Sequence, residues 1–331
     1  MSTSIGRRAF IAGAAAASGA AVTGFPAIVR GADVPHVKYQ TLSTGFGVIL
    51  NDALVKNRFD LKHGIQIDIT GTQPSLSAYY NDLIAGTTDI AIGGWDAFAQ
   101  RYLAGAPIQM VTMLTTAGMV GVVAGAHGPS TPEELKGKTV AGVLSSGTYR
   151  LAAAALRDFH HVDLEHDATV QNVESPATAV TLVVANRADA AVSWEPNLSV
   201  GIARDPSLRV IYDAGEDFRR HLGSPMPFFA LAGRKELLDQ NPGIGTKIAA
   251  AFDDAIHWIT ANQDAAIADS APLMEVPPAA LRLGFSAGRF TFEALPMMDP
   301  EGRKTVAIAA AYLLKNGQLP RKLDDGFFAL R

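Results

Sequence analysis

Two segments of this sequence repeat one another at a fixed spacing of 102 residues, from 42 to 144 at their starts and from 54 to 156 at their ends. Residues 42–54 read LSTGFGVILNDAL, and residues 144–156 read LSSGTYRLAAAAL. A second pair lies at nearly the same spacing: residues 89–96 read DIAIGGWD, and residues 189–195 read DAAVSWE with one residue fewer before the tryptophan. Because both matches occur in the same order, the sequence predicts two lobes built to one design.

The sequence around these segments alternates between strand and helix patterns. Polar and apolar residues alternate over 37–42 and 65–69, which is the period of a half-exposed strand. Beyond Gly233 strand patterns nearly disappear and amphipathic helices dominate. The sequence therefore predicts an α/β fold with a mostly helical C-terminal third. The expected helices are 48–57, 75–85, 96–103, 244–260, 263–271 and 303–315, with a buried strand at 89–92 and capped helix starts at Thr131-Pro132-Glu133-Glu134 and Ser175-Pro176.

The first 32 residues have the layout of an export signal. No acidic residue occurs in 1–32, and Arg7 and Arg8 precede an apolar stretch over 9–29. Residues 6–11 resemble the twin-arginine signal, although the ordinary secretory route and a retained membrane anchor also fit the pattern. We expect 1–32 to be cleaved from a mature protein that is periplasmic.

Composition excludes several classes of function. The 28 basic and 32 acidic side chains give a net charge of -4 without a basic run, so nucleic acid is not an expected partner. The chain has no cysteine, which excludes disulfides, thiolate metal sites and thiol nucleophiles. No GxSxG, P-loop or HExxH motif is present. We therefore expect no catalytic residues, no cofactor and no enzyme activity.

One group of potential metal ligands occurs in a single short segment. It consists of His160, His161, Asp163, Glu165, His166 and Asp167. The spacing fits no known metal site, and the segment follows a helix as a polar connection. We therefore expect no bound metal.

The repeated segments each place a Ser/Thr-Gly turn between a strand and a helix. Such a turn leaves backbone N–H groups of the first helical turn unpaired at the positive end of the helix dipole, which favours an anion. Alternatively, the hydroxyl groups only cap their own helices. Since open α/β sheets bind ligands beyond the carboxyl ends of their strands, the turns are candidate ligand sites. The candidate residues are Thr44, Gly45, Phe46, Ser145, Ser146, Gly147 and Thr148.

A tryptophan followed by a carboxylate occupies the equivalent position in the second pair of segments. Trp95 with Asp96 follows Gly94, and Trp194 precedes Glu195. A flat aromatic face can contact a ligand, and the adjacent carboxylate can accept a hydrogen bond from an amine. The alternatives are that the tryptophans fill the core and that the carboxylates, Asp96 especially, cap the helices that follow. We include all five residues among the candidates for ligand binding.

Four motifs between residues 39 and 229 carry a resemblance to a known family. They are Gly86-Thr87-Thr88-Asp89-Ile90-Ala91 before Gly93-Gly94, Pro132-Glu133-Glu134-Leu135-Lys136-Gly137-Lys138, Ser145-Ser146-Gly147-Thr148, and Trp194-Glu195-Pro196. With these motifs the chain resembles the substrate-binding proteins of ABC importers for nitrate, sulfonates, taurine and pyrimidine precursors of thiamine.

The resemblance implies a type II periplasmic-binding-protein fold, in which two α/β lobes are joined by two crossover segments with a ligand cleft between them. Lobe one would comprise 33–117 and 225–331, and lobe two 118–224, with crossovers near 114–118 and 222–227. It also implies a monomer that captures a small organic anion or zwitterion, of the sulfonate or carboxylate type, and delivers it to an ABC permease in the inner membrane. The alternatives are a binder of an aminopyrimidine-type heterocycle, a solute-sensing partner of a membrane receptor, and an enzyme similar to the pyrimidine synthases, whose cysteine-rich motif this chain lacks.

Overall fold

The computed structural model describes residues 34–42, 45–73 and 75–330, except the side chain of Leu76. The predicted export signal and the candidate residue Thr44 lie outside the described residues. The chain divides into two units, Met1–Val34 and Pro35–Arg331, and the described helices and strands all lie in the second unit. No helix among the described residues is both long and apolar enough to cross a membrane.

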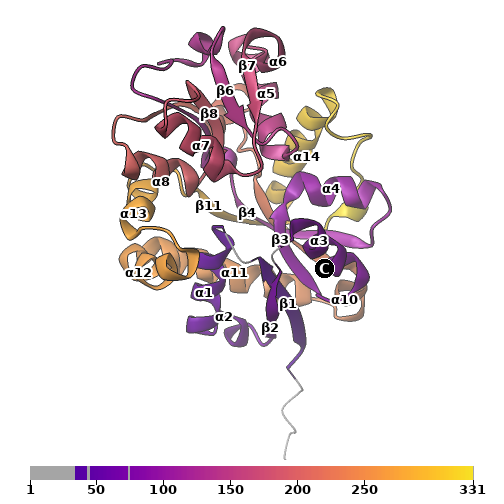
Figure 1. Cartoon of the computed structure of the whole chain (residues 1–331). Helices are drawn as coiled ribbons and strands as arrows, with labels where there is room; N and C mark the ends of the chain where they lie inside the picture. Colours follow the sequence, from indigo (N-terminus) through magenta and orange to yellow (C-terminus); the bar gives the residue numbers. More distant parts are fainter. Residues whose placement is uncertain (1–33, 43–44, 74, 331) are drawn as a thin grey trace, which may run out of the picture. The chain divides into compact units, whose positions relative to one another are not determined.

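A mixed six-stranded sheet forms the base of the first lobe (Figure 1), with the strand order β11-β4-β10-β3-β1-β2. β1 pairs in parallel with β2 and β3, whereas β10 runs antiparallel between β3 and β4, and β11 runs antiparallel along the outer edge of β4. The strands are β1 (His36–Leu42), β2 (Gln66–Gln73), β3 (Ile90–Gly94), β4 (Ile108–Thr115), β10 (Phe229–Arg234) and β11 (Phe292–Pro296).

A five-stranded sheet with the order β7-β6-β8-β5-β9 forms the base of the second lobe. β6 pairs in parallel with β7 and β8, and β5 runs antiparallel beside β8. The neighbours of β6 thus match the neighbours of β1 in the first sheet, which agrees with the repeat in the sequence. The strands are β5 (Val120–Ala124), β6 (Thr139–Gly142), β7 (Thr169–Asn172), β8 (Ala190–Trp194) and β9 (Arg209–Asp213).

Helices connect the parallel strands and pack against the two sheets (Figure 1). Ser75 and Ser175 cap α3 and α7 as their patterns predict, because each side chain accepts a hydrogen bond from a backbone N–H three residues on. Helices in the first 223 residues are α1 (Gly47–Asn57), α2 (Phe59–Lys62), α3 (Leu76–Ala85), α4 (Trp95–Leu103), α5 (Gly147–His160), α6 (Leu164–Asp167), α7 (Pro176–Val184), α8 (Asn197–Arg204) and α9 (Ala214–Leu222).

A turn begins after Thr131 as predicted, but the prediction of a capped helix there is wrong. The segment is only a single 3-10 turn, η2 (Pro132–Leu135), and the Thr131 side chain makes no capping hydrogen bond. Glu134 instead accepts a hydrogen bond from the backbone N–H of Ser130 at 2.7 Å. The turn ends at Leu135, because Lys136 is extended and Gly137 follows with a φ of +76°, a conformation that does not continue a helix.

The C-terminal part is mostly helical, as predicted, but it also contains the unpredicted strand β11. All five residues of β11 are half-buried, without the alternation that marks a strand in the sequence. Its strand conformation follows from pairing with β4 at Thr112, Met113 and Thr115. The helices of this part are α10 (Lys235–Gln240), α11 (Ile244–Ala261), α12 (Gln263–Met274), α13 (Pro278–Ser286) and α14 (Pro300–Lys315).

The chain crosses between the two sheets twice. It leaves the first sheet after β4 through Thr116 and the short turn η1 (Ala117–Met119), and it returns through 223–228 between α9 and β10. The two crossings are hydrogen-bonded to each other, since Ala117 N–H donates to the Met226 carbonyl at 2.9 Å and Phe228 N–H donates to the Thr115 carbonyl at 2.9 Å. The predicted fold of two α/β lobes joined by two crossovers is confirmed, whereas the lobe boundaries along the chain stay predictions.

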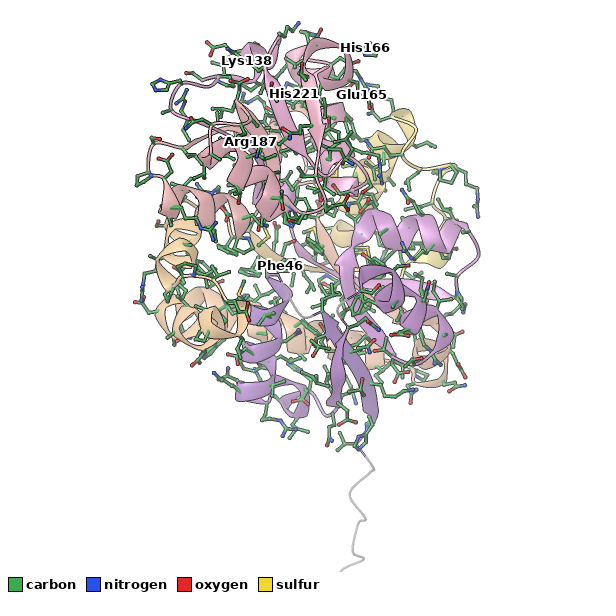
Figure 2. The ribbon with its side chains drawn as sticks, viewed as in Figure 1. Phe46, Lys138, Glu165, His166, Arg187 and His221 are labelled. Carbon is green, nitrogen blue, oxygen red and sulfur yellow. The ribbon has the colours of Figure 1, made fainter. Side chains whose placement is uncertain are left out.

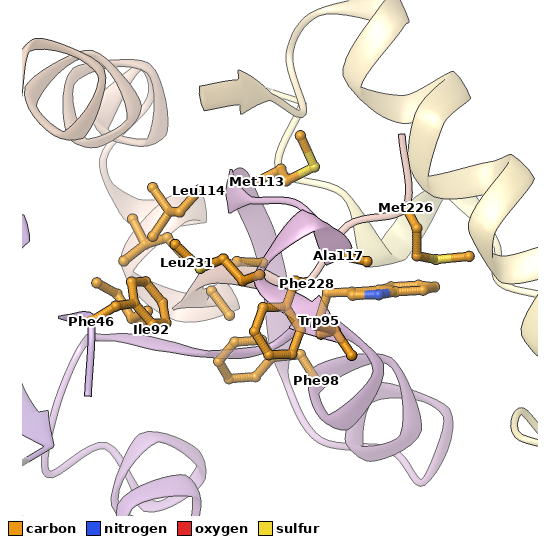
Figure 3. Close-up of a cluster of buried hydrophobic side chains, with 14 of the residues drawn as sticks. Phe46, Ile92, Trp95, Phe98, Met113, Leu114, Ala117, Met226, Phe228 and Leu231 are labelled. Atoms are coloured by element: carbon orange, nitrogen blue, oxygen red, sulfur yellow. The ribbon is translucent and has the colours of Figure 1, made fainter. Parts of the chain in front are cut away.

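A large hydrophobic core runs through the crossings. Figure 3 shows Trp95 and Phe98 of α4 beside Phe228, with Ala117 and Met226 of the two crossings close by. All of these side chains are buried. The crossings are therefore fixed by apolar packing as well as by hydrogen bonds.

Candidate ligand-binding site

The predicted turns lie directly after four strands. Gly45 and Phe46 follow β1, Asp96 follows β3 in the first turn of α4, the serine-glycine turn follows β6, and Glu195 follows β8. Within each sheet these strands are parallel, so the turns share one edge of their sheet. Figure 2 shows Phe46 at the end of α1 that is nearer to the second lobe.

Two of the turns, one from each lobe, touch each other at Asp96 and Gly147. A β-carbon built on Gly147 would lie only 2.1 Å from Asp96 Oδ2, and one built on Gly94 would lie 2.7 Å from Asp96 Oδ1. The Asp96 carboxylate therefore lies against the main chain of a glycine in each lobe. Any larger residue at Gly147 would displace it.

Burial raises the pKa of the Asp96 carboxyl, whereas backbone N–H groups of α4 and the charges of Arg150 and Arg101 act in the opposite direction. Asp96 is in contact with the first turn of α5 through Gly147, at the positive end of a helix of 14 residues. The N-cap position of α4 is Gly94, which has no side chain, and Asp96 lies in the first turn, where backbone N–H groups of Asp96 and Ala97 favour its charged form. This placement agrees with the capping alternative. A carboxylate has about four acceptor positions, so Asp96 can still accept a hydrogen bond from a ligand.

The start of α5 supplies hydrogen-bond donors from the main chain rather than from Ser146. The Ser146 hydroxyl donates to the Val143 carbonyl at 2.8 Å and accepts from the Tyr149 N–H at 3.0 Å, so it caps its own helix. In the described part of the chain, no acceptor is found for the N–H groups of Gly147 and Thr148. Ser145 is exposed and Thr148 is half-buried.

The side chain of Arg150 brings positive charge to the same turn. Its Nη1 donates to the Ser145 carbonyl at 2.7 Å, and its charge acts on Asp96. Groups of both signs therefore lie side by side at the start of α5. An arrangement of this kind suits a ligand with an anionic end and a donor end.

The two tryptophans differ in burial although their sequence contexts match. Trp95 is only 2% exposed and belongs to the core drawn in Figure 3, so the core-filling alternative describes its position. Trp194 ends β8 and is half-buried. Of the two rings, Trp194 has the surface to contact a ligand.

Glu195 is buried and its carboxylate is already paired. Its Oε1 accepts from Arg289 Nε at 2.6 Å and from Ser199 Oγ at 2.9 Å, and its Oε2 accepts from the Ser199 N–H at 3.2 Å. The capping alternative therefore describes Glu195 at the start of α8. Sequence reasoning missed Arg289, because it lies 94 residues away in a segment without a motif.

The turn after β1 is apolar in the described residues. Gly45 has a φ of +94°, which favours glycine there, and the Phe46 side chain is 4% exposed. The ring of Phe46 lies 4.6 Å from that of Phe229 and 6.2 Å from that of Phe292, measured between centroids. Sequence reasoning also missed these two partners, which come from β10 and β11.

The described residues hold no group of three or more His, Cys, Asp or Glu side chains placed to bind a metal ion. His160 instead forms hydrogen bonds with Glu133 at 2.7 Å and Asp217 at 2.6 Å. A hollow of about 630 Å³ lies elsewhere, between α10 and residues 325–330, and none of the predicted site residues lines it.

The two lobes, the paired crossings and the turns at the strand ends together define the periplasmic-binding-protein fold. A family model described as NMT1/THI5 like matches residues 59–266, which is more than half of the chain. The chain belongs to this NMT1/THI5-like family, and the resemblance inferred from the sequence is confirmed. A search of curated proteins finds no match.

Solved structures support the same fold. The periplasmic aliphatic sulphonate-binding protein SsuA from Escherichia coli is 19% identical with a TM-score of 0.71, covering 87% of this chain and 90% of that one. The alkanesulfonate-binding protein SsuA from Xanthomonas axonopodis pv. citri, bound to MOPS, is 18% identical with a TM-score of 0.67, covering 88% and 96%. The desulfurization enzyme DSZB is 18% identical with a TM-score of 0.60, covering 89% and 96%. At these identities the likeness establishes the fold alone.

Proposed function

We propose that this protein is a periplasmic solute-binding protein that captures a small organic anion or zwitterion and delivers it to an ABC-type importer. The observation that carries the proposal is the contact between Asp96 of the first lobe and Gly147 at the start of α5. A ligand that entered here would touch both lobes, as capture by closure requires. The two SsuA proteins of similar structure bind sulfonates.

The ligand's anionic group would lie at the start of α5. Its partners would be the N–H groups of Gly147 and Thr148, the hydroxyls of Ser145 and Thr148, and the Arg150 guanidinium. Loss of 1–32 would leave 25 basic and 32 acidic residues, so net charge would not attract an anion and local donors must hold it. Gly45, Phe46 and Trp194, together with Thr44, would surround the rest of the ligand.

The amine of a zwitterion would donate to Asp96. We assign this role to Asp96 rather than to Glu195, because both oxygens of Glu195 already accept hydrogen bonds from Arg289 or Ser199. Among the described residues no nucleophile and base are paired at this place, which favours binding over catalysis in spite of the likeness to DSZB.

Calorimetric titration with a matched pair of ligands tests the proposal. Taurine and ethanesulfonate share the sulfonate, but only taurine carries an amine. Asp96→Asn should weaken binding of taurine much more than binding of ethanesulfonate, and Gly147→Ala should weaken both, because the added methyl group would lie 2.1 Å from Asp96 Oδ2. Gly125→Ala is the matched control for a glycine substitution, because Gly125 has no positive φ and the added methyl group would meet its nearest neighbour, Val183, at 3.5 Å. Unchanged affinity in Gly147→Ala would contradict the proposed site.

Periplasmic location is tested by sequencing the N-terminus of the exported protein. We expect it to begin between residues 26 and 34. Replacing Arg7 and Arg8 with lysine should block export if the twin-arginine route is used. Intact chains in the membrane fraction would contradict cleavage.

A further inference from the structure

Five phenylalanine rings, which we call the phenylalanine wall, gather at the edge of the first sheet. Adjacent rings within the wall lie 4.6 to 6.2 Å apart between centroids, within the range of favourable aromatic contacts. The members of the wall are Phe46, Phe229, Phe285, Phe290 and Phe292.

Strand direction places three of these rings at the edge of the sheet where the candidate turns after β1 and β3 lie. Phe46 follows β1, Phe229 is the first residue of β10 and pairs with Gly94, and Phe292 is the first residue of β11 and pairs with Thr115. Since β10 and β11 are antiparallel to β3 and β4, their starts lie where β3 and β4 end. The wall therefore occupies the edge from which the chain crosses to the second lobe.

The wall is held in position, yet it keeps apolar surface exposed. Phe46 and Phe290 are only 4% and 8% exposed, whereas Phe229, Phe285 and Phe292 are half-buried. The ring of Phe290 requires the glycine at 284, because a β-carbon there would lie 2.4 Å from it. Fixed aromatic rings that stay partly exposed beside a binding site favour an apolar ligand group.

The wall begins next to the polar contact between the lobes. Phe229 pairs with Gly94 across the β3–β10 ladder, and Asp96 Oδ1 lies 2.7 Å from the β-carbon position of Gly94. Asp96 in turn touches Gly147. Polar groups and rings thus form adjoining parts of one surface.

We infer that the ligand carries an aromatic ring, which lies against Phe229 and Phe292 while its charged group lies at Asp96 and Gly147. This inference rests on the proposed function and narrows it to aromatic sulfonates and carboxylates. A small aliphatic ligand would satisfy the polar groups but would leave the half-buried rings uncovered. Burial of a ring against them adds apolar contact and ring-to-ring attraction.

The test compares benzenesulfonate with ethanesulfonate by calorimetric titration, and includes benzamide as a neutral ring. We expect benzenesulfonate to bind the wild-type protein at least about tenfold more tightly than ethanesulfonate. Phe229→Leu and Phe292→Leu should each weaken benzenesulfonate binding by about three- to tenfold and leave ethanesulfonate unchanged. Phe59→Leu, which removes a half-buried ring at the start of α2 that packs against the core, is the matched control and should change neither affinity.

The outcomes separate this inference from the proposed function. Equal affinity for both sulfonates would overturn the aromatic ligand and leave the anion-binding proposal standing. Binding of benzamide without either sulfonate would support the ring and overturn the anion. Absence of binding by all three probes would overturn both. The wild-type comparison decides the matter even if a leucine variant fails to fold.

Discussion

At the scale of single residues, Glu195 is the position where structure most changes the interpretation. The sequence places a carboxylate beside a tryptophan at the end of a strand, which is a pattern typical of a ligand contact. The structure pairs that carboxylate with Arg289 at 2.6 Å, and the Arg289 side chain is only 14% exposed. Glu195 therefore stabilises the contact between α8 and the segment before β11.

Glu195→Gln should destabilise the fold by about 3 kcal/mol, because it leaves the Arg289 charge buried without its partner. Chemical denaturation measures the loss. Glu216→Gln, which removes the partner of Arg220 in an exposed pair, is the control and should cost less than about 1 kcal/mol. A Glu195→Gln protein of full stability that lost affinity only for amines would restore Glu195 to the ligand site.

His160 makes the stability of the second lobe depend on pH. Burial alone would lower the pKa of His160, but hydrogen bonds to Glu133 and Asp217 and their negative charges raise it above its usual value. A raised pKa means that the folded state binds the proton more tightly than the unfolded state. The resulting stability is fully present below about pH 6.5 and is lost as pH rises through the folded-state pKa.

The free energy of unfolding should therefore differ most between wild type and His160→Gln at acidic pH. The difference should shrink as pH rises above the folded-state pKa. Urea denaturation over the range of pH 5 to 9, about two units on either side of neutrality, measures it. His127→Gln, at an exposed histidine, is the control for the loss of an imidazole. A difference that grew with pH would contradict the role of His160.

At the scale of elements, the sequence predicts those helices, strands and caps whose conformation is determined by residues close in the chain. β1, α1 and the Ser175 cap follow from residues close in sequence. β11 does not, because its conformation depends on pairing with β4, more than 170 residues earlier. Trp95 and Trp194 share one local pattern, but only packing decided that the first is buried and the second half-buried. The same limit hid the phenylalanine wall, whose members come from the N-cap of α1, from α13, β10 and β11, and from the segment before β11.

Substitution of Ser146 distinguishes the two interpretations of the serines at the start of α5, which are helix capping and hydrogen bonding to a ligand. Ser146→Ala should lower the free energy of unfolding by about 1 kcal/mol, the usual cost of losing an N-cap. Ligand affinity should change little, because the hydroxyl hydrogen is donated to Val143. Ser175→Ala at α7 is the control and should cost a similar amount of stability. A loss of affinity in Ser146→Ala without loss of stability would identify Ser146 as a ligand donor.

At the scale of the whole molecule, contacts between the lobes extend beyond the candidate site. α13 packs against α8, and Tyr312 of α14 contacts Phe159 and Phe218 at ring-centroid distances of 5.9 and 5.1 Å. When the lobes open, either these contacts break, or α13 and α14 move together with the second lobe. The paired crossings are the connection about which such a motion would turn.

We expect ligand binding to close the lobes. Small-angle scattering should give a smaller radius of gyration with saturating ligand than without it. Arg150→Ala should bind the ligand more weakly and therefore need a higher ligand concentration for the same compaction. An unchanged radius in the presence of a ligand whose binding is shown by calorimetry would indicate a rigid molecule.

The placement of β10 between β3 and β4 bears on the order in which the protein folds during synthesis. Every strand of the second sheet leaves the ribosome before β10 does, because the second sheet spans residues 120–213 and β10 begins at Phe229. The nascent chain can therefore complete the second sheet while β3 and β4 still lack the strand that joins them. Until β10 emerges, both strands present unpaired edges that invite wrong pairing. Folding of the first lobe is consequently a late event, completed by the last third of the chain.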